Sequence, residues 1–210
     1  MNYQNMQYQI FDIYEAGGLT VTNLAPSTIE GIEFSMQARV AHLGVNLGVA
    51  YNHSKLGAVT LLNSAALPAG FNSPVPYVQC GSPLMSPGGE CFNYLPYLQS
   101  VSGEQNPFSP KLTGNVSVDY AIALGNASLD PRVTYSYVDR QYTSVFQSPY
   151  TLVPSRGLLG ANLDYVTGPW TAELYGTNLA NKVYLSGTDA GANVYYGAPR
   201  QLGVRVMRTF

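Results

Sequence analysis

Residues 111–137 read KLTGNVSVDYAIALGNASLDPRVTYSY, and this stretch decides the fold. Apolar side chains alternate with small or polar ones along both halves, which is the two-residue period of a β-strand with two different faces. Gly125-Asn126 interrupts the pattern as a tight-turn dipeptide, and the alternation resumes from Ala127 to Tyr137. The apolar row of the first half consists of Leu112, Val116, Val118, Tyr120, Ile122 and Leu124. The stretch therefore predicts one antiparallel hairpin.

Both strands of this hairpin are unusually long. Each half of the stretch alternates over roughly ten residues or more, whereas the mean strand of a globular protein has about 5–6. A strand of about 9–11 residues is what a tilted crossing of a bilayer requires. The length therefore favours a strand that spans a membrane.

The same alternation recurs along the chain, and helix signals are nearly absent. The segments that show it are 4–14, 32–40, 43–51, 112–124, 127–137, 159–165, 170–175 and the terminal run 202–210. About eight strands are therefore expected, in an all-β fold.

The composition excludes several classes of protein. The chain has 210 residues and a net charge of −2, and only 10% of its residues are charged, against about 25% in a typical soluble domain. The sequence lacks the basic stripe that is expected of a nucleic-acid-binding protein. It also has no apolar run long enough for a membrane-spanning helix. The composition still allows a transmembrane β-barrel, because the strands of such a barrel are only half apolar.

The faces of the strands distinguish a membrane barrel from a soluble β-sandwich. The polar face of a soluble sandwich meets water and carries many Lys and Glu, but here it carries small neutral groups and sparse charges of both signs. Aromatic residues lie near strand ends, as in the interfacial girdles of membrane barrels; they are Tyr51, Tyr120, Tyr135, Tyr165 and Trp170. The barrel is the favoured interpretation, and the soluble sandwich is the alternative.

Short and long connections alternate between the expected strands. Short turns fall near 41–42, 125–126 and 167–169, and long loops cover 15–28, 54–109, 142–155 and 178–197. Short periplasmic turns and long extracellular loops are typical of outer-membrane barrels. The terminal strand follows a long loop, so Phe210 is expected on the periplasmic side.

The longest loop, 54–109, contains both cysteines of the chain, Cys80 and Cys91. A local disulfide is the preferred interpretation and implies an oxidising compartment, with two free thiols as the alternative. Between Leu56 and Gly103 the only charged residue is Glu90. Loops this long are usually functional or disordered, and an ordered surface cap is favoured here over a flexible segment.

No catalytic, cofactor-binding or metal-binding motif stands out. The two histidines, His42 and His53, are expected at opposite sides of the membrane, so a shared site is not predicted. No Gly-rich stretch opens a helix that could hold a phosphate. The charged residues expected to face a barrel interior are Glu33, Arg39, Asp119, Asp130 and Arg132, which we interpret as a polar wall with ion pairs across strands.

Three motifs resemble those of TonB-dependent outer-membrane receptors. Residues 23–33, NLAPSTIEGIE, resemble the strand entry N-x-x-x-[ST]-x-x-G-x-E of that family, and residues 174–184, LYGTNLANKVY, resemble its N-L-x-[DN]-K-x-Y element. Residues 197–204, GAPRQLGV, are similar to its final-strand motif G-x-P-R-x-x-G-V, which Phe210 completes. Each motif alone is weak, but their order and the rhythm of strands and loops strengthen the resemblance.

The resemblance implies a fragment of a receptor. Such receptors carry a signal peptide, a TonB box, an N-terminal plug domain and a barrel of about twenty-two strands. Residues 1–210 would be the C-terminal portion of that barrel, with the plug domain and the N-terminal barrel strands absent. The implied localisation is the outer membrane of a Gram-negative bacterium. The implied partners are outer-membrane lipid, the TonB complex through the missing N-terminal part, the barrel-assembly machinery that reads Phe210, and a small nutrient ligand.

The function implied by the resemblance is transport, such as the uptake of iron–siderophore complexes, and not catalysis; no cofactor is expected. One alternative is a self-contained eight-stranded barrel with a structural or adhesive role. A barrel hydrolase with a Ser/His pair near His53 is a third, less favoured hypothesis.

Overall fold

The computed structural model describes residues 2–3, 7–11, 19–23, 26–68, 77–83, 88–189 and 193–210, and it describes side chains from residue 26 onward. The regular secondary structure of this part of the chain is β-strand, apart from three short 3-10 turns. None of its helical segments is long and apolar enough to cross a membrane.

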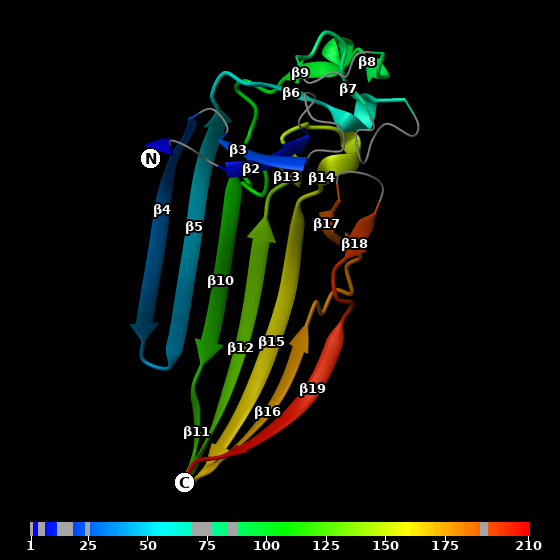
Figure 1. The fold of residues 1–210 in the computed structure, drawn as a ribbon. Coiled ribbons are helices and arrows are strands. Elements are labelled where there is room, and N and C mark those ends of the chain that lie inside the picture. Colours follow the sequence, from blue (N-terminus) through cyan, green and yellow to red (C-terminus); the bar gives the residue numbers. More distant parts are fainter. Residues whose placement is uncertain are drawn as a thin grey trace.

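One large antiparallel sheet forms the body of the structure and curves as a tall wall (Figure 1). Its strands follow the order β1-β4-β5-β10-β12-β15-β16-β19, and β11 pairs beside β12. The long strands are β4 (Ser27–Val40), β5 (Leu43–Leu56), β10 (Leu112–Tyr120), β12 (Ala127–Val138), β15 (Arg156–Thr167), β16 (Trp170–Thr177) and β19 (Gln201–Arg208); the short ones are β1 (Asn2–Tyr3) and β11 (Ile122–Leu124). Each long strand neighbours the next long strand in sequence, so the predicted meander of long hairpins is confirmed.

The hairpin of residues 111–137 has the predicted pairing. β10 and β12 run antiparallel, with Asp119 directly opposite Arg132. β10 ends at Tyr120, and the Ala121 N–H donates to the His42 carbonyl at 2.9 Å. Because β5 begins only at Leu43, β11 continues along β12 without a second neighbour.

The three short turns lie at one end of the wall, which we call the turn end; the opposite end is the loop end (Figure 1). Ala41, Gly125 and Gly168 take positive φ values of 51°, 63° and 52° in these turns. Tight two-residue hairpin turns require such backbone angles. The predicted alternation of short turns and long loops is confirmed.

The first part of the chain departs from the prediction. The expected strand 4–14 does not join the wall within the described residues: β2 (Gln7–Phe11) pairs instead with β3 (Leu19–Asn23) in a separate two-stranded sheet. The expected loop 15–28 therefore contains a strand, and β4 already begins at Ser27. Alternation alone predicts a strand but does not identify its partner. Residues 4–6 and 12–18 lie outside the described part.

The loops carry short elements of their own and form a cap at the loop end. These elements are β6 (Thr60–Leu62), η1 (Ser64–Ala66), β7 (Val78–Gln79), β8 (Cys91–Phe92), η2 (Leu95–Tyr97), β9 (Leu98–Ser100), β13 (Gln141–Tyr142), η3 (Pro149–Thr151), β14 (Leu152–Val153), β17 (Leu185–Thr188) and β18 (Val194–Tyr196). In the described part of the 54–109 loop, the expectation of an ordered cap is confirmed.

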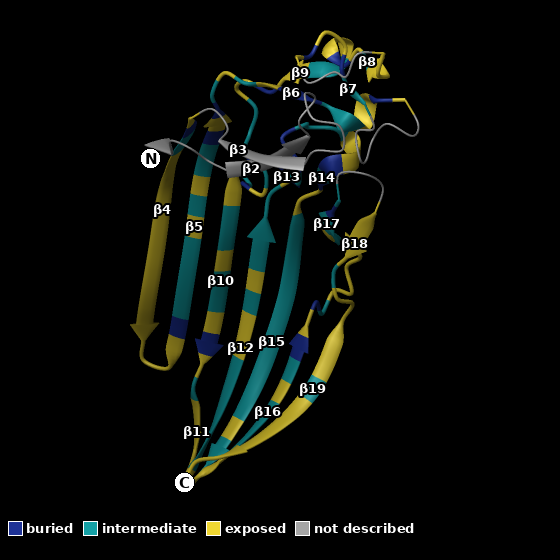
Figure 2. Ribbon diagram, in the orientation of Figure 1, coloured by how far each residue is buried: buried dark blue, intermediate teal, exposed yellow. Residues whose placement is uncertain are grey.

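The burial of the wall is the reverse of that of a soluble protein (Figure 2). On β10, Asp119 is only 7% exposed, whereas its neighbours Val118 and Tyr120, which point to the other face, are 42% and 47% exposed. The buried apolar residues lie mainly in the cap, in two small clusters. An apolar face this open requires lipid or a partner to cover it.

Within the described residues, the wall has two open edges. β4 pairs with β1 only through its first two residues, Ser27 and Thr28, and β19 ends the strand order on the other side. Both edge strands are exposed along almost their whole length (Figure 2). The sheet is therefore a part of a barrel wall and not a closed barrel, since lipid does not tolerate unpaired backbone groups.

Candidate functional site

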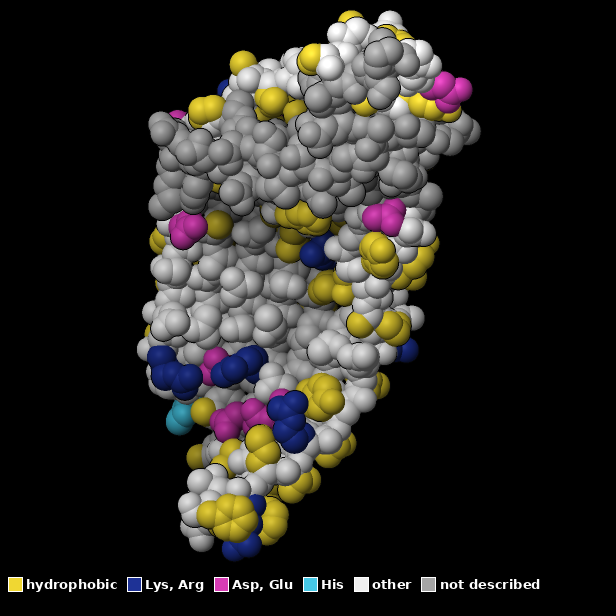
Figure 3. Space-filling model, in the orientation of Figure 1, with side chains coloured by type: hydrophobic (Ala, Val, Ile, Leu, Met, Phe, Trp, Pro, Cys, Tyr) yellow, Lys and Arg dark blue, Asp and Glu magenta, His cyan; other side chains and the backbone are white. Residues whose placement is uncertain are grey.

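The polar face of the wall carries two transverse rows of charged residues near the turn end, which we call the charged belt (Figure 3). In the first row Asp119 accepts a hydrogen bond from Arg39 at 3.0 Å and lies 3.7 Å from Arg132. The Asp119 side chain is 10% exposed, while those of Arg39 and Arg132 are 61% and 49% exposed. The expected ion pairs across strands are present.

Gly44 makes room for this cluster. It lies opposite both Asp119 on β10 and Arg39 on β4. A Cβ atom at residue 44 would lie 2.7 Å from Cγ of Asp119, which is closer than real Cβ contacts allow. The absence of a side chain at Gly44 therefore lets the carboxylate lie flat against β5 and reach Arg39.

The second row places carboxylates on three neighbouring strands. Asp130 is opposite Asp164, Asp164 is opposite Glu173, and Glu173 is opposite Arg205. Like charges directly opposite one another destabilise a sheet, and neighbouring groups offset this repulsion: Arg205 lies 3.1 Å from Glu173, Ser128 donates to Asp130 at 2.8 Å, and Asn162 donates to Asp164 at 3.1 Å.

Above the charged belt, the polar face is hollowed, and the charged side chains that line the hollows are glutamates. A hollow of about 700 Å³ lies over β4, β5, β10 and β12, and a second of about 820 Å³ lies nearer the loop end. Glu33 lines both, and Glu30 also lines the second. The other lining groups are hydroxyls, amides, glycines and apolar side chains. This surface can offer hydrogen bonds to a ligand from its hydroxyl and amide groups.

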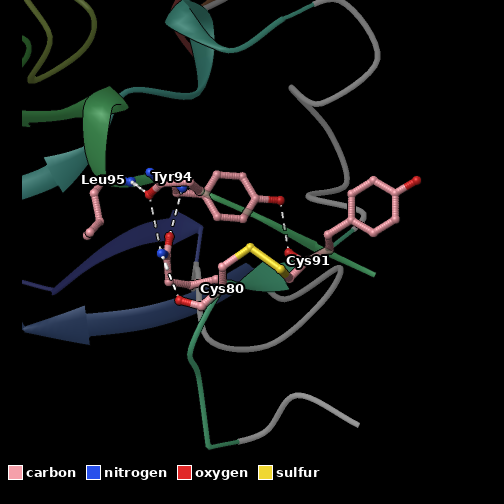
Figure 4. The surroundings of a disulfide bond; sticks show 7 residues. Cys80, Cys91, Tyr94 and Leu95 are labelled. Carbon is pink, nitrogen blue, oxygen red and sulfur yellow. Dashed lines mark hydrogen bonds between the residues drawn. A yellow bond between two sulfur atoms is a disulfide. The ribbon is translucent and has the colours of Figure 1, made fainter. Parts of the chain in front are cut away.

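The cap is tied together around Cys80 and Cys91, whose sulfur atoms form a disulfide (Figure 4). Beside it Tyr94 is fully buried, and its hydroxyl donates to the Tyr77 carbonyl at 2.9 Å. Gln79 accepts a hydrogen bond from the Tyr94 backbone N–H at 2.7 Å. Burial raises the pKa of Tyr94, and a hydrogen bond to Glu90 raises the pKa of Tyr77.

A buried polar junction fixes the cap to the wall. Asn106 donates from its amide to the Ser27 hydroxyl at 2.6 Å and from its backbone N–H to Ser54 at 3.1 Å. Ser27 is fully buried and Ser54 is 5% exposed. Asn52 on β5 also donates to Ser109 at 2.8 Å. The C-terminal end of the 54–109 loop is therefore held on β4 and β5.

The three long loops also contact one another. Val145, from the 142–155 loop, is fully buried against Leu56, Leu61 and Val101. The Thr143 hydroxyl lies 2.7 Å from that of Thr188, which links the second loop to the third. Sequence reasoning predicted each loop but not their association, because no local pattern encodes such contacts.

The motif at residues 174–184 forms a hydrogen-bonded turn at the loop end. Asn178 has a φ of 46°, accepts from the Lys182 N–H at 2.9 Å, and donates to the carbonyls of Lys182 and Ala198. The Asn181 side chain accepts from the Arg200 N–H at 3.1 Å. Asparagine tolerates the left-handed region and also supplies these bonds. The second and third sequence motifs therefore meet at this turn.

At the turn end the chain closes with a cluster of aromatic rings and one cation. The Arg208 guanidinium lies 5.3 Å from the centre of the Trp170 ring and 4.9 Å from that of Phe210. Phe210 itself is fully exposed. Arg208 lies in the apolar row of β19. Its cation–π contacts, at the level of the membrane–water interface, account for a charged residue in that row. The role of Phe210 in barrel assembly stays a prediction.

The described residues give no support for a catalytic or metal centre. They contain no group of three or more His, Cys, Asp or Glu side chains able to hold a metal ion. His42 lies in the β4–β5 turn, and His53 lies on β5 opposite Glu30. Ten strand residues lie between the histidines, and eleven steps along the strand cover about 37 Å, so they do not share a site.

Sequence reasoning placed Glu33, Asp119 and Arg132 on the polar face but overlooked Arg156. Arg156 begins β15, and its guanidinium lies over the Tyr184 ring at 5.8 Å. Extending the alternation of β15 backwards from Leu158 would have found this residue, but the expected strand began only after it.

The comparisons with known proteins agree with this architecture. The family model described as TonB dependent receptor-like, beta-barrel matches residues 1–179. A search of curated protein sequences found no match. Among solved structures, the ferric yersiniabactin uptake receptor FyuA from Yersinia pestis is similar with a TM-score of 0.64 and 15% identity, over 91% of this chain and 25% of that one.

Two receptors from Acinetobacter baumannii give a similar result. The ferric preacinetobactin receptor BauA matches with a TM-score of 0.63 and 18% identity, over 99% of this chain and 26% of that one. The siderophore receptor PiuA matches with a TM-score of 0.61 and 18% identity, over 98% and 24%. At these identities the likeness shows the fold alone, and the chain spans about a quarter of these receptors. On the match of the family model, the chain belongs to the family of TonB-dependent receptor β-barrels.

Proposed function

We propose that residues 1–210 are the C-terminal part of the barrel of an outer-membrane receptor, and that this receptor takes up a scarce nutrient such as an iron–siderophore complex. The observation that carries the proposal is the reversed burial of the wall: the ion-paired polar face is half-buried and the apolar face is open. Lipid on the apolar side and a polar lumen on the other satisfy both faces.

The parts of the structure suggest separate roles. The cap, held by its disulfide and by the Asn106 junction, would contribute to ligand capture at the cell surface. The two hollows would line the path into the lumen. The charged belt would face the plug domain, which the missing N-terminal part would supply together with the contact to TonB.

The remaining partners follow from the same proposal. The apolar face would contact the lipid of a Gram-negative outer membrane, and the machinery that assembles outer-membrane barrels would recognise Phe210. The structural neighbours named as siderophore receptors support the choice of an iron complex as the first ligand to test.

Uptake in cells tests the proposal. A Gram-negative host that lacks its own siderophore receptors would express the receptor that carries this chain, and accumulation of radiolabelled iron would be measured with a panel of ferric siderophores. We expect accumulation that disappears when TonB is deleted. A variant without residues 58–102 serves as the control, since it should reach the membrane but lose uptake. Accumulation of no panel member, or accumulation without TonB, would contradict the proposal.

A further inference from the structure

Glu33 lies where the two hollows of the polar face meet. It is an exposed residue of β4, and it lines both hollows. Ala50 is directly opposite it on β5, and Thr113 follows on β10. Both of these neighbours also line the two hollows. Because the side chains beside it are small, the Glu33 carboxylate is open to a molecule that enters either hollow.

The Glu33 carboxylate has no cation beside it. The ion pairs of the described residues all lie in the charged belt. Arg39, the arginine of the belt on β4, is six residues from Glu33, which is about 20 Å along the strand. No described lysine or arginine lines either hollow, and Glu30 also lines the second. A cleft lined by charges of one sign attracts the opposite charge, so the hollows favour a ligand with a positive charge.

An exposed aromatic residue, Phe108, lines the second hollow together with Glu33. It is 64% exposed, and its φ of 55° lies in the left-handed region that bulky residues rarely adopt. Its backbone N–H donates to the Tyr142 carbonyl at 2.8 Å, and the next residue, Ser109, accepts a hydrogen bond from Asn52 at 2.8 Å. Contacts on both sides therefore hold Phe108 in this conformation and leave its ring at the hollow.

A carboxylate and an aromatic ring on the same hollow suit one class of ligand. The face of an aromatic ring attracts a cation, and substituted ammonium groups are the ligands that most use this attraction. Such a group also carries apolar methyl or methylene groups, which pack against the ring. The second hollow, at about 820 Å³, has the size of a pocket for a small organic molecule.

The first hollow adds neutral groups for the rest of such a ligand. Ser35 and Ser136 offer hydroxyls, and Asn115 offers an amide. Gly48 lies opposite both Ser35 and Asn115. A Cβ atom at residue 48 would lie 2.6 Å from Oδ1 of Asn115, so the amide lies across β5 at the floor of the hollow. These groups can hydrogen-bond hydroxyls and amides of a ligand whose cation is held above them.

We propose that Glu33 and Phe108 form a cation-binding site of the receptor, and that its ligand presents a substituted ammonium group to them. The proposal rests on the proposed function, because it names the chemistry of the nutrient that the receptor would take up.

Thermal unfolding of the purified receptor that carries this chain tests the proposal, with choline as the probe. Choline chloride replaces sodium chloride at constant ionic strength, and the unfolding midpoint is recorded at each choline concentration. We expect a saturable rise for the wild type. The apparent Kd should be about fivefold weaker for Glu33→Gln, as for the loss of one exposed ion pair. For Phe108→Leu it should be about two- to fivefold weaker, as for the loss of a cation–π contact.

Two controls separate this site from general effects of the probe. The uncharged analogue dimethylbutanol, in which carbon replaces the nitrogen of choline, should give no saturable rise. Glu104→Gln removes a carboxylate that lines neither hollow, and it should bind choline as the wild type does.

The absence of a saturable response to choline, an equal response to the uncharged analogue, or a wild-type Kd in Glu33→Gln would refute the proposal. If Glu33→Gln does not fold, a wild-type Kd in Phe108→Leu refutes it equally. Choline binding that depends on Glu33 in a receptor without iron uptake would leave the site standing and reject the transport of iron complexes.

Discussion

The cluster around Asp119 gives the most specific prediction about the wall. The Asp119 side chain is 10% exposed and is the buried member, whereas Arg39 and Arg132 keep 61% and 49% of their side chains exposed. Removing a buried charge and removing its exposed partners are therefore not equivalent. The two kinds of variant should differ in their free energy of unfolding, even though both lose the same ion pairs.

The expected loss of unfolding free energy depends on which charged group loses its partner. Asp119→Asn releases two arginines that water can solvate, so it should cost only about 1–2 kcal/mol, near the value of one hydrogen bond to a charged group. Arg39→Gln with Arg132→Gln leaves the buried carboxylate without a cation, and the cost approaches the 3–5 kcal/mol of a broken buried pair. Gly44→Ala should resemble Asp119→Asn, because the added Cβ displaces the carboxylate.

Urea unfolding of the receptor that carries this chain, in detergent micelles, measures these differences. Gly114→Ala is the matched control on the neighbouring strand, since a Cβ there would lie 3.5 Å from its nearest neighbour. The reasoning fails if Asp119→Asn destabilises the receptor as much as the double arginine variant. It also fails if Gly44→Ala and Gly114→Ala have equal unfolding midpoints.

Three further predictions concern the cap and the lipid face. Replacing Cys80 and Cys91 by Ser removes a cross-link between residues 11 apart, and should lower cap stability by about 3 kcal/mol; limited proteolysis measures this, and unchanged resistance would count against it. Burial raises the pKa of Tyr94, so the stability it contributes is complete below about pH 10 and is lost as pH rises through the raised pKa. Tyr94→Phe should abolish that loss of protease resistance at high pH, and an identical pH profile would contradict the assignment. Val133→Arg, on the apolar face, should cost about 2–4 kcal/mol in a bilayer while Thr134→Arg on the polar face is tolerated; equal yields of folded receptor would favour a soluble sheet.

Most of the wall could be predicted from the sequence because its information is local. Alternation placed Val118 and Asp119 on opposite faces. The turn at Gly125-Asn126 predicted the hairpin that pairs their strand with the strand of Arg132. The same rule predicted a strand in residues 4–14, and the described part, β2 (Gln7–Phe11), is a strand, but it pairs with β3 instead of entering the wall. A two-residue period encodes two faces but not a partner, so the choice of partner depends on contacts distant in the sequence.

The candidate site was predictable in its parts but not in its assembly. Low charge, long strands and the motifs ending in Phe210 were sufficient to indicate the family, since lipid outside and a polar lumen inside impose those patterns on the sequence. Only the tertiary structure determines which buried polar groups lack a partner. The register of the sheet brings Gly44 opposite Asp119 and so makes room for its carboxylate. The packing of the loops brings Tyr184 against Arg156, whose Nη1 is buried without a hydrogen-bond partner. In both cases the residues are tens of positions apart in the sequence.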